Sequence, residues 1–469
     1  MFFGREKELK TLNKAYSENI FQMVIMYGRR RVGKTTLLKE FLKDKNFILF
    51  LAEEANDQTN LQSFSKQIKK HFKLPDHFPN FPNWNDAFNA ITDKAKDERI
   101  ILVIDEYPYA ALANKSLNSI LQHTIDQNWK DTQLFLILCG SQISFMENEV
   151  MGYSSPLFGR RTMQMQILPF DFFDARNYFL DKTYEEQIEF YSAFGGTPYY
   201  LSKINAKLTF TENILKLFLE TSGYLYEEPM MLLQQELREP RLYNTIISLI
   251  ASGATTMNEL SSKAKIDSRI TNKYVSILMS LQILRRNIPF GADTFKSRNS
   301  RYYVDDNLYR FWFLFIFPNK GAIELDEGDQ VLTGKVLPAL SRFIGKPVFE
   351  DICLQWLKRK NKARKLPEVF VNFGSWWGQD KEKKKPTDVD IVASSLDEKI
   401  ILLGECKWRN DINYTKEIEK LLDKKRLFPN YDKYYFYFFS KIPFSSQARK
   451  LEKEHESLKL IELKDLFSF

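Results

Sequence analysis

Apolar runs alternate with helical patterns through the first third of the chain. Five strand-like runs centre near Val24, Ile48, Val103, Ile137 and Met165, and stretches with helical periodicity separate them. Short, continuous apolar runs are typical of strands that are buried on both faces. The alternation therefore predicts an α/β domain over residues 1–168, with a parallel sheet and helices on both of its faces.

The pattern changes three times after this domain. Residues 169–239 have helical periodicity with a break at Gly195-Gly196-Thr197-Pro198, which predicts a helical lid subdomain. Residues 240–330 give three short helices and then strand-like segments near Leu284 and Tyr303, the order of a winged helix-turn-helix and its linker. Residues 331–469 return to strand-like runs between helices, which predicts a second α/β domain.

Composition excludes the membrane and secreted classes. The chain has 469 residues, of which 44% are hydrophobic and 27% charged, as expected of a globular protein with several domains. The most aromatic run, residues 311–317, ends at Pro318 and is far shorter than the roughly 20 apolar residues that cross a bilayer. Charged residues follow Met1-Phe2-Phe3 at once, unlike a signal peptide, and three scattered cysteines make no disulfide framework. We expect a cytoplasmic protein that does not contact membranes.

The formal net charge of +8 is unevenly distributed. Most of the excess of lysine and arginine lies after Ser341. A basic domain favours a polyanion partner such as DNA, but a solvated, lysine-rich surface explains the charge equally well.

A phosphate-binding loop follows the first predicted strand. It consists of Gly28, Arg29, Arg30, Arg31, Val32, Gly33, Lys34 and Thr35, with Thr36 opening the helix behind it. The glycines let backbone N–H groups turn toward a phosphate, Lys34 reaches the β- and γ-phosphate oxygens, and the Thr35 hydroxyl ligates Mg²⁺. The strand, loop and helix order predicts that the chain binds a nucleoside triphosphate.

Two further strand ends supply groups for hydrolysis. The run from Ile100 ends in Asp105 and Glu106, so that Asp105 would hold the Mg²⁺ shell and Glu106 would deprotonate the attacking water. Ser141 ends the next strand and is placed to sense the γ-phosphate. Arg160, in the segment Pro156-Leu157-Phe158-Gly159-Arg160, is a candidate for the developing charge, either in its own chain or in a neighbour of a homo-oligomer. A surface arginine is the alternative.

The predicted winged helix offers groups for a DNA groove. Its second helix exposes Arg269, Asn272 and Lys273, and Arg285 and Arg286 follow at the wing. Because the helix is not strongly basic, a winged helix that packs or binds a partner protein remains an equal alternative.

Two neighbouring strand-like runs near the carboxyl end carry paired acids and a lysine. Asp390 lies on one run, and Glu405 and Lys407 share a face of the other, with Cys406 opposite. Metal-dependent phosphodiester nucleases need this set: Asp390 and Glu405 would bind Mg²⁺, and Lys407 would position the hydroxide. Glu350 adds a further carboxylate. A sheet edge with cross-strand ion pairs is the alternative.

Taken together, these motifs resemble the archaeal-type P-loop ATPases, relatives of the AAA+ and STAND NTPases, that carry a winged helix and a C-terminal nuclease-like domain. The likeness runs nearly end to end and rests on the loop and on Phe3-Gly4-Arg5-Glu6, Ile104-Asp105-Glu106, Cys139-Gly140-Ser141, Gly195-Gly196-Thr197-Pro198, Ser300-Arg301-Tyr302-Tyr303, Asp388-Val389-Asp390 and Gly404-Glu405-Cys406-Lys407. It implies ATP as the nucleotide and a restriction-endonuclease-like, PD-(D/E)xK fold at the end. Asp388, the acid beside Asp390, departs from the family pattern if the family has a longer glutamate at that position as a metal ligand. Asp388 would then reach less far toward the metal.

Two functions remain open on this basis. In the first, Mg²⁺-dependent ATP binding and hydrolysis are coupled to DNA binding, with phosphodiester cleavage by the terminal domain. In the second, the chain is a STAND-like ATP-dependent switch or DNA-binding regulator whose nuclease-like domain is inactive.

Overall fold

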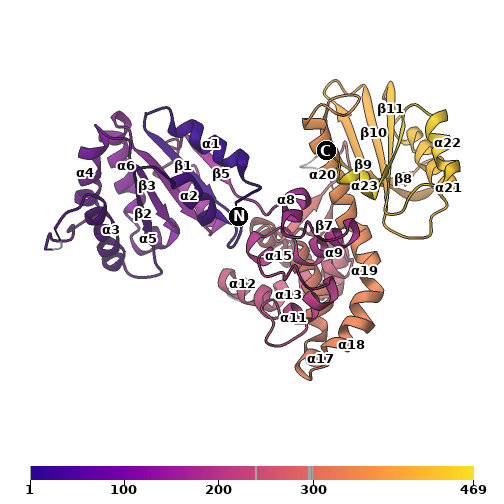
Figure 1. Cartoon of the computed structure of the whole chain (residues 1–469), viewed down its shortest axis with the longest axis horizontal. Coiled ribbons are helices and arrows are strands. Elements are labelled where there is room, and N and C mark those ends of the chain that lie inside the picture. Colours follow the sequence, from indigo (N-terminus) through magenta and orange to yellow (C-terminus); the bar gives the residue numbers. More distant parts are fainter. Residues whose placement is uncertain (1, 76, 238–239, 294–296, 298, 469) are drawn as a thin grey trace. The chain divides into compact units, whose positions relative to one another are not determined.

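The computed structural model describes residues 2–75, 77–237, 240–293, 297 and 299–468. The chain divides into two compact units (Figure 1). The first comprises Met1–Phe170 with Thr197–Tyr199, and the second Asp171–Gly196 with Tyr200–Phe469.

The first unit is built on a five-stranded sheet in which all neighbouring strands are parallel. The strand order is β2-β3-β4-β1-β5, and the bounds are β1 (Gln22–Tyr27), β2 (Phe47–Leu51), β3 (Ile101–Asp105), β4 (Phe135–Gly140) and β5 (Met163–Gln166). The five strands predicted from the apolar runs are confirmed. Strand β4 lies between β1 and β3, so its end is flanked by the ends of both.

Helices cover both faces of this sheet, because alternate residues of each strand point into different cores. Met23 and Ile25 of β1 belong to one core, and Val24 and Met26 to the other. The first core includes side chains of α3 (Asp57–His71), α4 (Trp84–Ala95), α5 (Tyr107–Ala113) and α6 (Leu117–Gln127). The second includes side chains of α1 (Glu6–Tyr16) and α2 (Lys34–Leu42). The three layers are those predicted.

The second unit begins with helices. They are α8 (Phe172–Ala175), α9 (Tyr184–Phe194), α11 (Phe210–Phe218) and α12 (Glu228–Glu236), and α10 (Pro198–Leu201) spans the division between the units. The aromatic run at 311–317 is helical and buried within this unit, where the Trp312 indole N–H donates to the Tyr226 carbonyl at 2.8 Å. It is a core segment that begins in α16 (Asn307–Phe311).

Three helices and a two-stranded sheet form the winged helix. They are α13 (Pro240–Ala251), α14 (Met257–Ala264), α15 (Ser268–Ser280), β6 (Leu284–Asn287) and the antiparallel β7 (Arg301–Val304). A capping box begins α14: Thr256 accepts from the Glu259 N–H, and Glu259 accepts from the Thr256 N–H. The predicted end of the lid, Glu239, lies outside the described residues.

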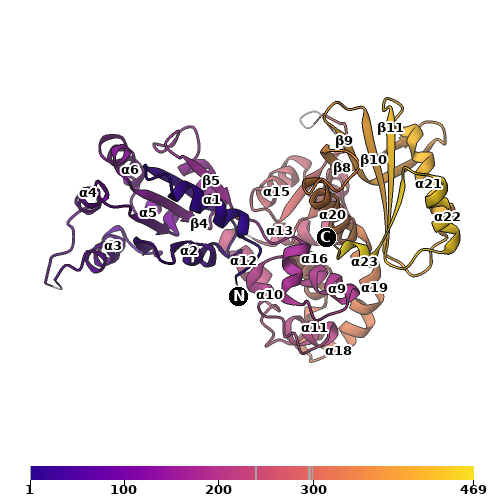
Figure 2. The same cartoon turned by 45° about the horizontal axis from the view of Figure 1, so that its top comes forward.

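A mixed five-stranded sheet follows α17 (Lys320–Glu324), α18 (Gly328–Val331), α19 (Leu337–Phe343) and α20 (Glu350–Lys362) (Figure 2). Its strands are β8 (Phe370–Asp380), β9 (Lys385–Ser395), β10 (Ile400–Lys407), β11 (Lys433–Ser440) and β12 (Leu458–Glu462), with helices α21 (Tyr414–Asp423), α22 (Ser446–Glu454) and α23 (Leu463–Leu466). β8, β9 and β10 are antiparallel, and β11 and β12 continue parallel to β10.

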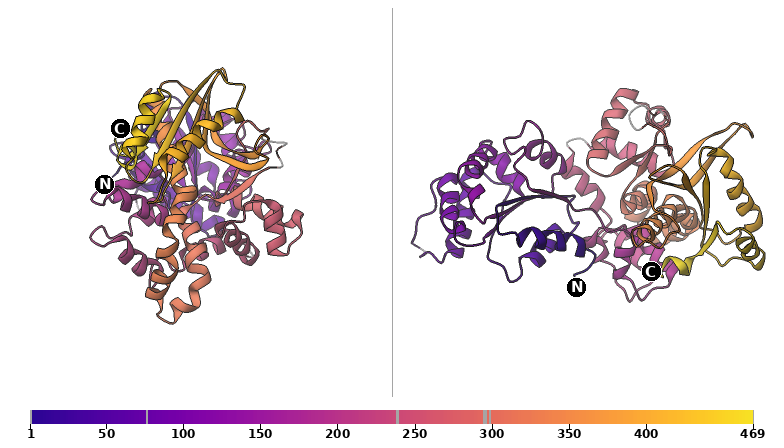
Figure 3. Two further views of the ribbon diagram at one scale, coloured as in Figure 1. Left: turned by 90° about the vertical axis from the view of Figure 1, so that its right-hand side faces the viewer. Right: turned by 90° about the horizontal axis from the view of Figure 1, so that it is seen from above.

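Helices lie on both faces of this second sheet (Figure 3). Ile418 and Leu421 of α21 pack with Ile401 and Leu403 of β10 on one face. Cys353 of α20 meets the Cys406 thiol on the other. The alternation along β10 therefore places Glu405 and Lys407 on the α21 side, as their spacing predicted.

Within the described residues, no helix is both long enough and apolar enough to cross a bilayer.

Candidate functional site

The phosphate-binding loop joins β1 to α2 in a conformation that needs its glycines. A Cβ on Gly28 would lie 2.2 Å from the Ile167 carbonyl oxygen, so only glycine fits there. Gly33, with φ of 91°, adopts the left-handed region directly before α2. No side chain caps the amino end of α2, and its first N–H groups therefore face the loop, where an anion would bind.

The side chain of Lys34 is buried and folds back on the loop. Its ammonium group donates to the Gly28 carbonyl at 2.8 Å and to the Arg29 carbonyl at 3.1 Å. These two carbonyl oxygens occupy the role that phosphate oxygens have in a nucleotide complex. The lysine charge is thus held inside the loop.

Thr35 and Asp105 meet across the sheet edge. The Thr35 hydroxyl donates to Asp105 Oδ2 at 3.3 Å, which joins the loop after β1 to the end of β3. A hydroxyl and a carboxylate are the hard oxygen donors that Mg²⁺ prefers, so this pair fits the predicted metal. Thr36 is exposed on the same turn of α2.

Glu106 is engaged by Ser141. The Ser141 N–H and hydroxyl both donate to Glu106 Oε2, at 3.1 and 2.8 Å, and Glu106 has a strained φ of 51°. Because β4 lies between β1 and β3, its end brings Ser141 beside the acid that follows β3. The sequence predicted Ser141 as a phosphate sensor; the structure gives it a contact with the predicted base.

Neighbouring side chains secure the arginines and Val32 of the loop. Arg30 donates to the Tyr109 hydroxyl at 2.9 Å, and the Arg31 guanidinium lies 4.9 Å from the centroid of the Tyr199 ring. Buried Arg5 donates to the Val32 carbonyl at 3.0 Å and to the Leu168 carbonyl at 2.5 Å. The predicted motif around Arg5 therefore ties the loop to the chain that follows β5.

Arg160 is held by Asp126 of α6 and by carbonyls of its own segment, and it is not brought to the loop. Its guanidinium Nε donates to both carboxylate oxygens of Asp126 at 3.1 Å, and it also donates to the Pro156 carbonyl at 2.8 Å. Hydrogen bonds from Arg160 and then from Lys130 lower the pKa of Asp126. The assignment of Arg160 to the γ-phosphate stays a prediction, and it requires that the Arg160 side chain be released from Asp126.

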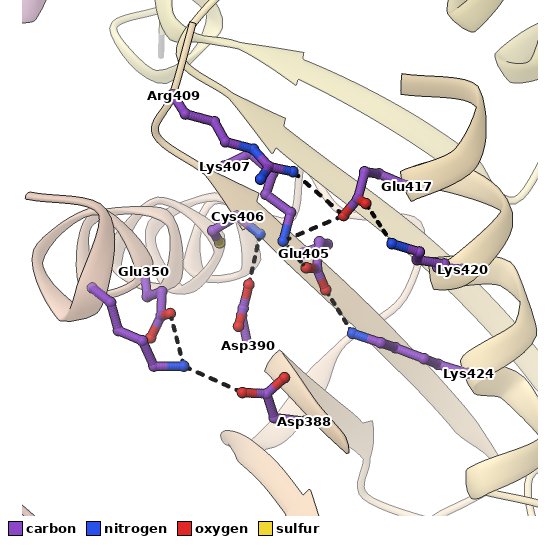
Figure 4. Close-up of polar contacts among 11 residues, drawn as sticks. Glu350, Asp388, Asp390, Glu405, Cys406, Lys407, Arg409, Glu417, Lys420 and Lys424 are labelled. Atoms are coloured by element: carbon purple, nitrogen blue, oxygen red, sulfur yellow. Dashed lines mark hydrogen bonds and ion pairs between the residues drawn. The ribbon is translucent and has the colours of Figure 1, made fainter. Parts of the chain in front are cut away.

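The terminal acids form a second cluster, in which Glu405 is surrounded by lysines (Figure 4). Lys407 pairs with Glu405 Oε1, and Lys424 donates to Oε2 at 2.7 Å. Burial would raise the pKa of Glu405, but Lys424 and Lys407 outweigh it and lower that pKa. Lys407 also lies 3.6 Å from Glu417 of α21.

In the same cluster, burial and neighbouring negative charges disfavour the charged forms of Asp390 and Glu350. Asp390 Oδ2 accepts from the Cys406 N–H at 2.9 Å, while burial and then the charge of Glu405 raise the pKa of Asp390 to about 6. Burial and then Asp390 raise the pKa of Glu350 well above its ordinary value. Lys346 offsets part of this charge, since its ammonium group lies 3.4 Å from Glu350 and 3.3 Å from Asp388.

The structure does not bring the three predicted metal ligands into one group. Among the described residues, no three histidine, cysteine, aspartate or glutamate side chains converge as a metal site requires. Glu405 has both carboxylate oxygens on lysines, and Glu350 is paired with Lys346. As arranged here, the acids do not fit a bound Mg²⁺.

Sequence reasoning missed Lys346 and Lys424. Lys424 follows α21 in a run with Lys425 and Arg426, which looks like any solvated basic segment. Lys346 stands before Pro347, far from the strand motifs. The excess charge after Ser341 was the only signal, and it does not identify which lysines turn inward.

The winged helix exposes the face that was predicted for DNA. Arg269, Asn272 and Lys273 are all exposed on α15, whereas Thr271, Val275 and Leu278 are buried beneath them.

The two wing arginines are held by other residues of the second unit. Arg285 donates to Asp351 at 2.6 Å and to Asp305 at 3.4 Å. Arg286 donates to the Ser300 hydroxyl at 2.7 Å. Their predicted role as groove and phosphate contacts therefore gives way to pairing within the unit.

Two protein families match this chain. Residues 2–204 match an ATPase domain found predominantly in Archaea, and residues 312–421 match a family of archaeal and bacterial proteins of unknown function.

Relatives and a solved structure agree with these matches. An uncharacterised protein of Methanocaldococcus jannaschii, MJECL04, is 31% identical over 439 residues, which cover 93% of this chain and 94% of that one. An uncharacterised ATP-binding protein of the same organism, MJ0423, is 51% identical over 45 residues, covering 10% of this chain and 76% of that protein. The Walker-type ATPase of Pyrococcus abyssi has the same fold at 19% identity, with a TM-score of 0.50, over 66% of this chain and 96% of that one. The chain belongs to this predominantly archaeal family of P-loop ATPases.

Proposed function

We propose that this ATPase requires Mg²⁺ and couples ATP hydrolysis to the binding of DNA by its winged helix, in the cytoplasm. The contact between the Thr35 hydroxyl and the Asp105 carboxylate supports the metal requirement, because it pairs two oxygen donors beside the lysine of the loop. The exposed face of α15 supports the partner.

Each residue of the nucleotide site has a role that follows from its position. Lys34 exchanges the Gly28 and Arg29 carbonyls for phosphate oxygens and neutralises their charge. Thr35 and Asp105 would hold Mg²⁺, which when bound would offset the charge of the β- and γ-phosphates. Glu106 would orient and deprotonate the attacking water, and the Ser141 N–H and hydroxyl hold its Oε2 in place.

DNA binding is tested by Arg269→Ala together with Lys273→Ala. Both side chains are exposed on α15 and would contact phosphates, so their loss removes two cations from the interface. We expect weaker duplex binding and a decrease of roughly 1–2 in the slope of log K against log salt. Fluorescence anisotropy over a salt series measures both the affinity and the salt slope. The same DNA should also stimulate ATP turnover less in the double variant than in the parent.

Lys335→Ala is the matched control, since Lys335 is an exposed lysine outside the winged helix. An unchanged salt slope in the α15 variant would remove this helix from DNA binding.

The terminal domain has two candidate roles. Its strand order, with three antiparallel strands followed by two parallel ones beside α20 and α21, supports a nuclease-like fold in which Asp390, Glu405 and Lys407 lie together. Phosphodiester cleavage would need Glu405 to release a lysine before a metal could bind. The saturation of Glu405 by Lys407 and Lys424 favours the second role, a nucleic-acid-binding module in an ATP-dependent switch.

Lys407→Ala distinguishes these roles. If the domain cuts, removal of the lysine that would stabilise the attacking hydroxide should slow Mg²⁺-dependent nicking of supercoiled plasmid by about 100-fold or more. Lys420→Ala is the control, because Lys420 also pairs with Glu417 but lies half exposed on α21. Equal nicking by the Lys407 variant and the parent would exclude the domain from cleavage, and a parent that never nicks would exclude cleavage as an activity of this chain.

A further inference from the structure

A cavity of about 290 Å³ lies within the second unit, where the wing meets the terminal sheet. β6 and β7 of the wing form one wall, and β8 and β9 form another. The turn at Lys346 and the start of α20 close it. The wing of the winged helix thus belongs to the same cavity as Asp388 and Asp390.

Specific contacts between the wing and β8 hold the two walls of the cavity together. The Phe290 N–H donates to the Ser375 carbonyl at 2.8 Å, and the Trp377 indole N–H donates to Asn299 at 3.2 Å. The Arg301 guanidinium lies over the Trp377 ring, 4.6 Å from its centroid. A backbone hydrogen bond, a side-chain hydrogen bond and a cation–π contact fix the two elements together.

The wing side of the cavity combines cations with aromatic rings. Arg301 lines the cavity and lies over the Trp377 ring, and a guanidinium group supplies the N–H donors that recognise phosphate oxygens. Tyr303 adds a ring that is partly exposed. Arg285, by contrast, is neutralised by Asp351 and Asp305.

The opposite side of the cavity carries the acids of the candidate cleavage site. Asp388, Asp390 and Glu350 line it, and Lys346 bridges Asp388 and Glu350. A phosphate would therefore lie against Arg301, because the carboxylates of the opposite side repel it, and Tyr303 would face the base. Phosphate on one side and a planar apolar group on the other are the chemistry of a nucleotide.

We propose that this cavity takes one unpaired nucleotide, so that the DNA bound by the terminal domain carries a single-stranded end or overhang. The proposal rests on the proposed DNA binding. A volume of about 290 Å³ falls just below the range for ligand pockets, roughly 300–1,000 Å³, and suits one nucleotide and not several. An intact duplex cannot enter such a space, whereas an unstacked base can lie on the partly exposed Tyr303 ring, beside the buried Trp377.

The test compares three hairpin DNAs with the full-length protein: one blunt, one with a 3′ overhang of three thymidines, and one with the same overhang at the 5′ end. We expect at least one overhang to bind about tenfold more tightly than the blunt hairpin, the gain typical of one stacked base. In Arg301→Gln the ratio of the two dissociation constants should fall toward about 1. An equal affinity of the parent for all three hairpins would overturn the proposal.

A second readout locates the base directly and does not depend on a variant that folds. Overhang thymidine is replaced by 5-iodouracil, and the crosslinked peptide is found by mass spectrometry. Crosslinks to β8 or β7, at Trp377 or Tyr303, support the proposal, and crosslinks confined to α15 overturn it.

If no hairpin binds, the proposed duplex binding by α15 fails. A single-stranded hexathymidine that carries 5-iodouracil then decides the cavity separately. A crosslink at Trp377 or Tyr303 would support the proposed nucleotide site in the cavity, and the absence of any crosslink there would overturn it.

Discussion

Replacement of Lys34 by alanine is expected to abolish measurable ATP hydrolysis and to weaken ATP binding. The variant loses the cation that would neutralise the β- and γ-phosphates in both the ground state and the transition state. Loss of one such group costs on the order of 100- to 1,000-fold in kcat. Because the ammonium group donates, among the described residues, to the Gly28 and Arg29 carbonyls of its own loop, we expect the fold to survive its removal.

Isothermal titration calorimetry with Mg·ATP and a phosphate-release assay measure the two effects of the Lys34 variant. Lys39→Ala is the matched control, since Lys39 is an exposed lysine on the same helix, α2. Thermal unfolding of each variant separates a lost ligand contact from a lost fold. Undiminished hydrolysis by Lys34→Ala would refute the assignment of the loop.

Glu106→Gln is expected to separate binding from hydrolysis. Glutamine keeps an acceptor oxygen for the Ser141 N–H and hydroxyl but cannot take a proton from water. Loss of a general base costs typically 100- to 10,000-fold, so kcat should fall by about that much. Affinity for Mg·ATP should stay within about threefold, because Glu106 does not contact the loop lysine or Thr35 in the free protein.

A single-turnover assay checks this separation against binding measured by calorimetry. Glu54→Gln is the control, an exposed glutamate of the same unit that undergoes the same chemical change. If Glu106→Gln hydrolyses ATP as fast as the parent, another group activates the water. If it loses ATP binding as well, Glu106 supports the architecture of the site and the proposed role as base is wrong.

The parallel sheet of the first unit was predictable because its signals are local. Ile25, Ile104 and Ile137 lie in runs that are apolar on both faces, and such runs form strands wherever helices cover them. The loop residues were predictable for a similar reason, since Gly33 and Lys34 act through the backbone and side chain of one short segment. The spacing of Glu405 and Lys407 likewise determined that they share a face of β10.

Partners distant in sequence could not be predicted in the same way. Ser141 reaches Glu106 only because β4 is inserted between β1 and β3, and strand order is a property of the folded sheet. Arg160 binds the carboxylate of Asp126. The residues next to Arg160 in sequence do not show whether it pairs with a carboxylate or with a phosphate. Lys424 turns toward Glu405 while other residues of the same basic run do not.

By itself, then, the sequence determined that this protein has a nucleotide loop after a buried strand, a winged helix and a terminal sheet with paired acids, because each depends on the periodicity and chemistry of adjacent residues. The tertiary structure alone decided which charges meet, and it closed the cavity between Arg301 and Asp390 from segments that are separated in sequence. Coulombic and hydrogen-bond energies act over a few ångströms, and only folding sets those distances.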